Sequence, residues 1–202
     1  ETLALRTAAR RQPSAGEIEV RVDAAGLNFR DVLNALGMYE GPGGPLGSEF
    51  VGTVVARGDG VDFILGQRVM GMSAGAFRSH LTVSSRAVAR IPDALTNDQA
   101  ATLPIVFLTA MYSLERLARL QRGERVLIHA GAGGVGLAAI QVAQRCGAEI
   151  FATAGSDEKR AYLQSLGVKH VFNSRTQEFA EQILEVTSGA GVDVILNSLN
   201  GE

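Results

Sequence analysis

The sequence predicts an α/β protein built from two domains, a small β-barrel followed by an incomplete, doubly wound parallel sheet. Short β-rich runs separated by glycine turns fill the first hundred residues, which is typical of a barrel. From Arg125 onward, strand-like and helix-like runs alternate, as they do when crossover helices join parallel strands. A chain of 202 residues is long enough for two modest cores. We expect one domain over residues 1–100 and a second over residues 101–202.

The first domain is expected to open with a strand at residues 17–22, where apolar and charged residues alternate. We expect this strand to lie at an exposed edge. Residues 28–36 change to a helical period, and Gly37 is a good helix terminator. A loop rich in glycine and proline follows, so Tyr39 is expected on the shoulder of a loop. Further strands are predicted at residues 50–56, 68–72 and 77–83.

Thr96 and Gln99 form a capping-box pattern near the expected domain boundary. Only four strands fit between Arg125 and the last residue, Glu202, whereas the doubly wound fold usually has six. The second half of this sheet is therefore expected to be largely absent. Because the sequence starts without methionine, we also expect it to belong to a longer chain. The predicted strands cover residues 126–129, 150–153, 170–172 and 192–196, and the predicted helices cover residues 135–146, 158–166 and 179–186.

A glycine-rich turn lies between the first strand and the first helix of this second domain. Gly131, Gly133 and Gly136 match the pattern G-x-G-x-x-G, and Gly134 and Val135 lie within it. The first glycine permits the tight turn, the second lets the backbone approach a pyrophosphate, and the third lets the helix pack on the strand. An ordinary glycine turn is the alternative interpretation. The flanking strand and helix favour dinucleotide binding by a Rossmann domain.

The residues after the second strand of this domain favour NADPH over NADH. An NAD site has a carboxylate about 20 residues beyond the glycine turn, but this strand ends in residues 152–156, which include no acid. Ser156 can donate a hydrogen bond to a 2′-phosphate, and Lys159 adds a positive charge. A helix N-cap and a solvated lysine are equally good interpretations, and Asp157 fits the first turn of a helix. Arg175 is either a lid on the adenine or phosphate or a solvated side chain.

Charge and cysteine content argue against several function classes. Lys plus Arg number 19 and Asp plus Glu number 21, with no run of like charges, so neither nucleic acid nor a membrane is an expected partner. The single cysteine, Cys146, can form no internal disulfide, which favours a reducing, cytoplasmic setting. His80, His129 and His170 are scattered and form no ligand cluster with Cys146. We therefore expect no metal site.

A resemblance to one known family rests on four segments, which are Leu27–Leu33, Leu46–Phe50, Gln67–Gly71 and Leu196–Leu199. The sequence is similar to the enoyl-reductase domain of modular polyketide synthases and to that of animal fatty-acid synthase, within the medium-chain dehydrogenase/reductase superfamily. The resemblance runs along essentially the whole chain and implies a GroES-like barrel up to about Ala100, followed by a Rossmann domain. Zinc-bearing members have Gly-His-Glu where this sequence has residues 47–49, so Ser48 replaces a metal ligand.

The resemblance implies a reaction as well as a fold. The expected activity is the NADPH-dependent reduction of an α,β-unsaturated thioester carried by acyl carrier protein, next to other domains of the same polyketide synthase. Tyr39 matches the family position associated with protonation of the α-carbon, although it could equally pack a loop onto the barrel. Asn28, Thr109 and Asn197 match positions of the substrate or nicotinamide pocket. For Thr109 and Asn197, capping or turn roles are the alternatives.

The resemblance also has a gap. The family's other proposed proton donors, a lysine and an aspartate, lie beyond the fourth Rossmann strand and therefore past Glu202, so the piece alone is expected to be inactive. A stand-alone NADPH:quinone oxidoreductase is the second hypothesis, because it would share the glycine turn. A non-catalytic nucleotide-binding domain is the third.

Overall fold

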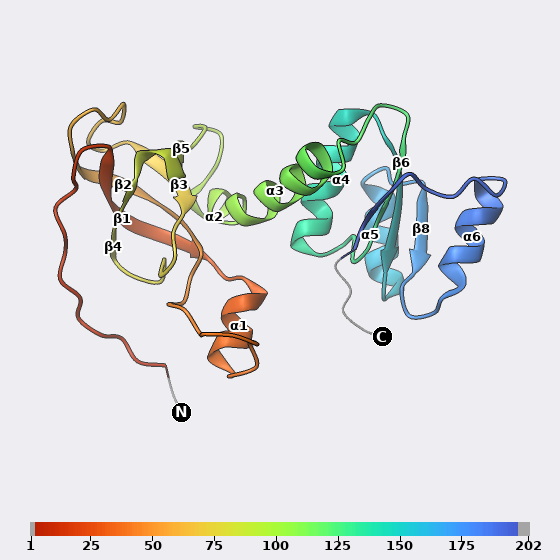
Figure 1. Ribbon diagram of the computed structural model, residues 1–202, viewed down its shortest axis with the longest axis horizontal. Helices are drawn as coiled ribbons and strands as arrows, with labels where there is room; N and C mark the ends of the chain where they lie inside the picture. Colours follow the sequence, from red (N-terminus) through yellow and green to blue (C-terminus); the bar gives the residue numbers. More distant parts are fainter. Residues whose placement is uncertain (1–2, 198–202) are drawn as a thin grey trace. The chain divides into compact units, whose positions relative to one another are not determined.

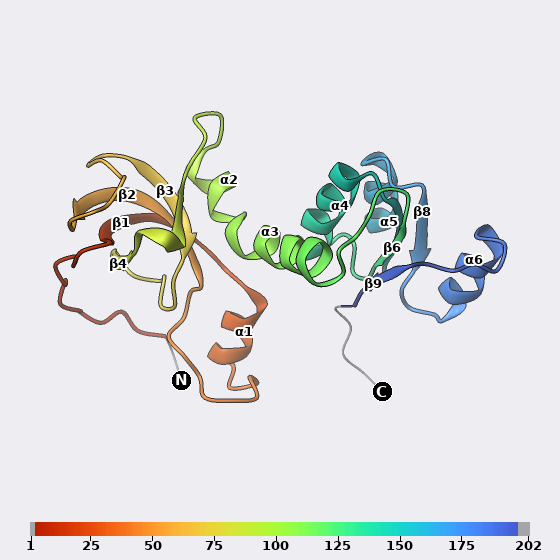
Figure 2. The same ribbon diagram turned by 45° about the horizontal axis from the view of Figure 1, so that its top comes forward.

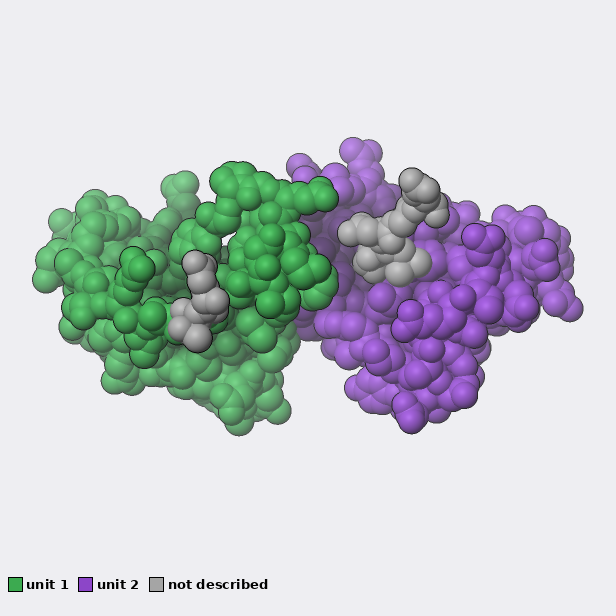
Figure 3. Space-filling view, turned by 90° about the horizontal axis from the view of Figure 1, so that it is seen from below, with its two compact units in different colours: residues 1–105 green, residues 106–202 purple. Residues whose placement is uncertain are grey.

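The computed structural model describes residues 3–197. The chain divides into two compact units, residues 1–105 and 106–202 (Figure 3). The first unit contains a five-stranded antiparallel sheet, and the second contains a four-stranded parallel sheet (Figure 1). An antiparallel β unit followed by a parallel α/β unit confirms the predicted fold class. Within residues 3–197, no helix is long and apolar enough to cross a membrane.

The sheet of the first unit has the strand order β4-β1-β2-β3-β5, and Figure 2 labels its strands β1 to β4. Its core is a cluster of buried branched and aromatic side chains that includes Ile18, Val20, Phe50, Val54 and Val69. Alternating side chains of neighbouring strands meet on one face, so each strand buries part of this cluster. The strands are β1 (Glu17–Gly26), β2 (Glu49–Arg57), β3 (Arg68–Met72), β4 (His80–Ser84) and β5 (Val88–Arg90).

The prediction that the first strand lies at an exposed edge is wrong. β1 lies between β2 and β4, and Ile18 pairs with Arg57 on one side and Val83 on the other. Glu19 is buried although it is charged, because both of its carboxylate oxygens accept hydrogen bonds from Arg10, at 2.7 and 2.8 Å. Apolar alternation reports which face of a strand is buried. It does not report whether the strand edges are paired.

Two helices of the first unit begin where the sequence predicts. α1 (Phe29–Ala35) has Asn28 as its N-cap, and the chain leaves it through Gly37, whose φ is 69°. α2 (Asn97–Ala101) has Thr96 as its N-cap, and the Thr96–Gln99 capping box is formed. α3 (Pro104–Met111) follows, and a π-helical turn at Tyr112–Leu117 leads into the second unit's sheet.

Parallel strands in the order β8-β7-β6-β9 form the second sheet, which carries helices on both faces. One core cluster joins α4 and Leu163 of α5 to the β6–β7 face, and another joins Ile183 of α6 to Leu127 and Phe151 on the opposite face. Helices on both faces are the mark of a doubly wound sheet. The elements are β6 (Arg125–Ile128), α4 (Gly134–Cys146), β7 (Glu149–Ala154), α5 (Asp157–Ser165), β8 (His170–Asn173), α6 (Glu178–Val186) and β9 (Val194–Leu196).

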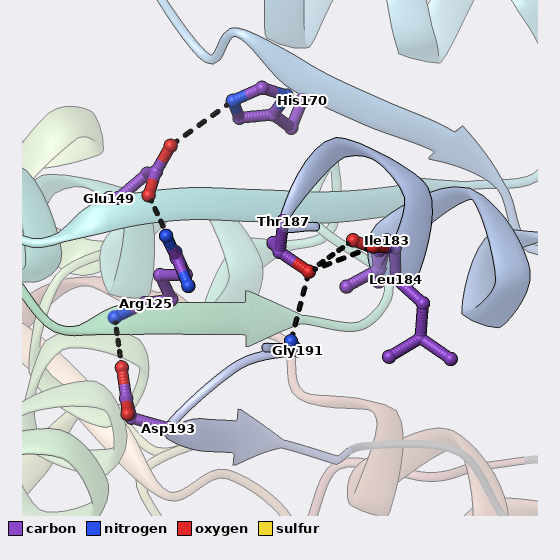
Figure 4. Close-up of polar contacts among 8 residues, drawn as sticks. All are labelled: Arg125, Glu149, His170, Ile183, Leu184, Thr187, Gly191 and Asp193. Atoms are coloured by element: carbon purple, nitrogen blue, oxygen red, sulfur yellow. Dashed lines mark hydrogen bonds and ion pairs between the residues drawn. The ribbon is translucent and has the colours of Figure 1, made fainter. Parts of the chain in front are cut away.

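Polar side chains tie the amino ends of these four strands together (Figure 4). Arg125 donates its backbone N–H to Asp193 at 2.8 Å, and its Nε lies 3.0 Å from Glu149. The other oxygen of Glu149 lies 3.3 Å from Nε2 of His170. In the connection before β9, the Thr187 hydroxyl donates to a carbonyl of α6 at 2.6 Å and accepts the Gly191 N–H at 2.9 Å. The glycine turn lies at the opposite, carboxyl end of the sheet, where sheets of this kind bind ligands.

Candidate functional site

The glycine-rich turn connects β6 to α4 at the carboxyl end of the sheet. Ala130 adopts a left-handed conformation with φ of 50°, and the Gly131 N–H donates to the Thr153 carbonyl of the neighbouring strand at 2.9 Å. A Cβ atom on Gly136 would lie 2.5 Å from the Ala130 carbonyl oxygen and 2.6 Å from that of Gly131. Only glycine lets the helix approach the turn this closely, which is the packing that the sequence pattern predicts.

The same turn leaves backbone N–H groups for an anion. α4 has 13 residues, and Gly133 is its N-cap with no side-chain hydrogen bond. The first N–H groups of a helix have no acceptor within the helix, and the helix dipole adds partial positive charge there. A Cβ on Gly133 would lie 3.2 Å from the Ala130 carbonyl oxygen, so glycine keeps this part of the turn narrow. This arrangement suits a phosphate group.

A cavity of about 300 Å³ lies beside the turn. The residues that line it come from three separate segments of the sequence. Each segment lies at the carboxyl end of one of three neighbouring strands, β6, β7 and β8. Two of its lining residues are cations, and none of those described is acidic. The lining comprises Ala130, Ala132 and Gly133, then Ala154, Gly155, Ser156 and Lys159, and finally Ser174 and Arg175.

Ser156 is a helix N-cap and Asp157 lies in the first turn of the same helix, which are the helical roles that the sequence allowed for them. The Ser156 hydroxyl caps α5 and accepts the Lys159 N–H at 3.4 Å, so its own hydrogen is available to a ligand. Asp157 lies in the first turn of α5 and pairs with Arg160, which also donates to the Ala154 carbonyl at 3.1 Å. The carboxylate that follows the lining residue Ser156 is thereby paired with a cation of its own helix.

Arg175 reaches from the end of β8 across Gly155. A Cβ on Gly155 would lie 2.7 Å from Nε of Arg175, so the guanidinium occupies the space that a side chain would fill. The backbone N–H of Arg175 donates to Oδ1 of Asn173 at 2.9 Å, and this hydrogen bond fixes the local backbone. Ser174 lines the cavity as well, and sequence reasoning missed it. Its place directly after a predicted strand and next to Arg175 was the available signal.

His129 is buried beside this site. Its Nδ1 lies 3.0 Å from the Thr153 hydroxyl, and its ring meets the Phe179 ring edge-on at 5.3 Å between centroids. Burial lowers the pKa of His129 from its ordinary value of 6.5, which favours the neutral imidazole. A neutral ring with these contacts supports the end of the sheet rather than supplying charge to the cavity.

The first unit holds two of the predicted site residues, Asn28 and Tyr39. Tyr39 is half-buried, and the Arg30 guanidinium lies 5.0 Å from its ring centroid. The Asn28 side-chain amide donates to Oε1 of Glu49 at 2.9 Å. Glu49 and Asp31 are buried carboxylates that sequence reasoning did not single out as site residues, although both lie in the segments that carried the resemblance.

The second unit holds the other two predicted pocket residues, and both are exposed. Thr109 lies on α3, and Asn197 follows β9 as the last described residue. Of the predicted cofactor-binding residues, Gly133, Ser156, Lys159 and Arg175 line the cavity beside the turn, whereas Gly131, Gly134, Val135 and Gly136 form the turn itself and the first turn of α4.

Comparison with known proteins agrees with both units. The alcohol dehydrogenase GroES-like domain family matches residues 14–93, and the zinc-binding dehydrogenase family matches residues 134–202. A polypeptide of the phenolphthiocerol/phthiocerol polyketide synthase of Mycobacterium tuberculosis is 51% identical over 197 residues, which are 96% of this chain and 9% of that protein. The chain therefore spans about a tenth of the length of the curated relatives it matches.

Solved structures of similar proteins cover nearly the whole chain. The CurK enoyl reductase is 49% identical with a TM-score of 0.91, over 97% of this chain and 63% of that one. The Escherichia coli quinone oxidoreductase complexed with NADPH is 32% identical with a TM-score of 0.86, over 98% of this chain and 62% of that one.

Zinc, which the name of the second family implies, does not suit the residues present. Within the described part of the chain, no three His, Cys, Asp or Glu side chains gather in one place. Ser48 offers a neutral hydroxyl, and both Glu49 oxygens already accept N–H groups of the protein. The Cys146 thiol lies 3.1 Å from the Leu120 carbonyl oxygen, on the helix after the glycine turn. These donors make no tetrahedral set.

Proposed function

This chain belongs to the medium-chain dehydrogenase/reductase superfamily, and we propose that it is part of an enoyl reductase of a polyketide synthase. The proposed reaction reduces an α,β-unsaturated acyl thioester, carried by acyl carrier protein, with NADPH. The observation that carries the proposal is the cavity beside the glycine turn, whose described lining offers two cations and no acid. The similarity to a mycobacterial polyketide synthase and to the CurK enoyl reductase supports the substrate class.

The residues present fit NADPH. The backbone from Gly131 to Gly136 and the first N–H groups of α4 would hold the pyrophosphate. Ser156, Lys159 and Arg175 would hold the 2′-phosphate, because a hydroxyl, an ammonium and a guanidinium are its usual partners. When bound, NADPH supplies the hydride that adds to the β-carbon of the thioester.

The chain's own residues would orient the reactants and supply a proton. Tyr39 would donate its hydroxyl proton to the α-carbon, as its place in the family pattern suggests. Asn28, Thr109 and Asn197 would line the substrate or nicotinamide pocket. Each has a polar side chain that can hydrogen-bond a carbonyl or carboxamide group.

A turnover assay with two substrates tests this proposal. The full-length parent protein is given NADPH with a crotonyl thioester and, separately, with a quinone, and the loss of NADPH absorbance is followed. Turnover of the thioester is the expected result. Turnover of the quinone alone would replace the proposal with the second candidate, a quinone oxidoreductase, which the 32% identity to the Escherichia coli enzyme favours. NADPH binding without either turnover would leave a non-catalytic nucleotide-binding domain.

A further inference from the structure

Two buried carboxylates hold Asn28 from two directions. Asp31 and Glu49 are each only 3% exposed. Asp31 accepts the backbone N–H of Asn28 at 3.0 Å and that of Gly47 at 2.8 Å, one on each oxygen. Glu49 accepts the Asn28 side-chain amide on Oε1 at 2.9 Å and the Ile105 N–H on Oε2 at 2.8 Å. The backbone and the side chain of Asn28 are therefore both anchored.

The neighbouring strand makes room for the Glu49 carboxylate. Gly26 is the cross-strand partner of Glu49, and a Cβ atom there would lie 2.3 Å from Oε1. Burying a carboxylate is costly unless hydrogen bonds replace its water shell. Here two N–H donors do so, one of them from the first turn of α3. Any side chain at position 26 would displace the acceptor that Asn28 uses.

This arrangement fixes the direction of the Asn28 amide. An ionised carboxylate only accepts hydrogen bonds, so Nδ2 rather than Oδ1 must face Glu49. Nδ2 carries two hydrogens, and Oε1 takes one of them. The second N–H is then held in a single direction on a half-buried residue.

We propose that Glu49 is a positioning residue of the reductase. It holds Asn28 so that the second N–H of Nδ2 donates to a carbonyl oxygen, either that of the thioester or that of the cofactor's carboxamide. This inference rests on the proposed function, in which Asn28 lines the reactant pocket. A donor that already points at a carbonyl oxygen stabilises the charge that develops there far more than a freely rotating donor does, because no reorientation is needed during the reaction.

The test is a double-mutant cycle in the full-length parent protein. Glu49→Gln keeps the shape but turns one acceptor into a donor, which then faces Nδ2 or the Ile105 N–H. We expect kcat for the crotonyl thioester to fall about tenfold. In an Asn28→Ala background the same change should alter kcat less than about twofold, because the group it positions is gone. Equal effects in both backgrounds would overturn the proposal.

A buried carboxylate that contacts no proposed site residue supplies the control. Glu19 is 4% exposed, lies in the same sheet, and accepts both of its side-chain hydrogen bonds from Arg10. Glu19→Gln should lower the urea midpoint of unfolding as Glu49→Gln does, yet leave kcat near that of the wild type. A matching loss of kcat in both variants would show that Glu49 acts through stability alone.

A second readout needs no turnover. In protein labelled with nitrogen-15 at asparagine, the two Nδ2 protons of Asn28 should be widely separated, with the bonded one downfield and slow to exchange with solvent. Glu49→Gln should bring the two resonances together, and Glu49→Asp, which keeps a carboxylate on a shorter arm, should give an intermediate separation. Asn28 resonances that do not respond to either variant would refute the positioning role, whatever the substrate.

The kinetic constants of the variants show whether Asn28 donates to the thioester carbonyl or to the carboxamide of the cofactor. They also separate a failure of the proposed function from a failure of the positioning role of Glu49. A higher KM for the thioester at unchanged NADPH affinity indicates the substrate carbonyl, and weaker NADPH binding indicates the carboxamide. If the wild type reduces only the quinone, the proposed function fails, and the same cycle measured with the quinone still decides the role of Glu49.

Discussion

The two units build their candidate sites from different parts of the polypeptide. In the second unit, backbone at Gly131, Gly133 and Gly136 shapes the turn, and the side chains of Ser156, Lys159 and Arg175 line the cavity beside it. In the first unit, Asn28, Asp31 and Glu49 form a network that depends on side-chain carboxylates. The backbone site has no room for an added atom at Gly136, whereas the side-chain site depends on keeping its hydrogen-bond acceptors. Substitutions in the glycine turn of the second unit should therefore be harmful because they add atoms, and those in the first unit because they remove hydrogen-bond acceptors.

The largest expected effect comes from adding one methyl group to the turn. In Gly136→Ala the new Cβ would meet the Ala130 and Gly131 carbonyl oxygens at 2.5 and 2.6 Å, and neither backbone atom can rotate away. We expect a loss of roughly 2–4 kcal/mol in the free energy of unfolding, together with lost NADPH binding. Urea unfolding and fluorescence titration with NADPH measure the two effects.

Gly133→Ala is the matched control within the same turn. Its Cβ would approach only the Ala130 carbonyl oxygen, at 3.2 Å, and Gly133 has φ of −85°, which alanine adopts readily. Stability should stay near that of the wild type, while NADPH binding should still weaken because the methyl group lies where the pyrophosphate is expected. A stable Gly136→Ala variant would contradict the close packing of turn and helix.

Removing an acceptor in the first unit should have the next largest effect. Asp31→Asn replaces one carboxylate oxygen by an NH₂ group that faces the N–H of Asn28 or Gly47. An unsatisfied buried donor costs about 2 kcal/mol, so the free energy of unfolding should fall by that amount. Asp93→Asn, at an exposed position of the same unit, should change it little. Equal stability of the two variants would show that the network is not needed for folding.

The third prediction concerns Lys159, which lines the cavity beside the glycine turn. Lys159→Ala removes a cation from the cavity, and the Kd for NADPH should rise about tenfold while the Kd for NADH stays nearly unchanged. Lys169, the other lysine of the sequence, is exposed and lines a different cavity, so Lys169→Ala is the matched control. Equal weakening of NADPH and NADH by Lys159→Ala would show that Lys159 does not contact the 2′-phosphate.

The same contrast explains how much the sequence alone could predict. The glycine turn was recognisable because its residues are consecutive and backbone geometry dictates their type. The network around Asn28 joins positions 26, 28, 31, 47, 49 and 105, which only the register of β1 against β2 and the return of the chain at α3 bring together. The central position of β1 was missed for the same reason, because strand pairing is a long-range property that local alternation does not encode.

Tyr39 tests the side-chain site at its least constrained position. The Arg30 guanidinium lies 5.0 Å from the centroid of its ring, and within residues 3–197 the Tyr39 hydroxyl takes part in no hydrogen bond. Tyr39→Phe keeps that contact and removes only the hydroxyl, so the rate should change a few-fold at most while the configuration at the α-carbon changes. Chiral analysis of the product from an α-methyl thioester measures this, and an unchanged configuration would remove Tyr39 from the protonation step.

The smallest effect is expected at a surface carboxylate of the first unit. Glu17 accepts hydrogen bonds from Nη1 and Nη2 of Arg11, both at 2.7 Å, and from the Ser14 N–H at 2.9 Å. These hydrogen bonds lower the pKa of Glu17 from 4.5 to about 2. Because its folded pKa is depressed, the pair stabilises the fold fully above pH 4.5 and loses that contribution as the pH falls toward about 2. The difference in unfolding free energy between wild type and Glu17→Gln should therefore shrink across this window, as urea titrations at several pH values can measure. A difference that stays constant down to pH 2 would mean that the effect of the substitution is steric, and that ionisation of this exposed pair adds nothing to the sheet.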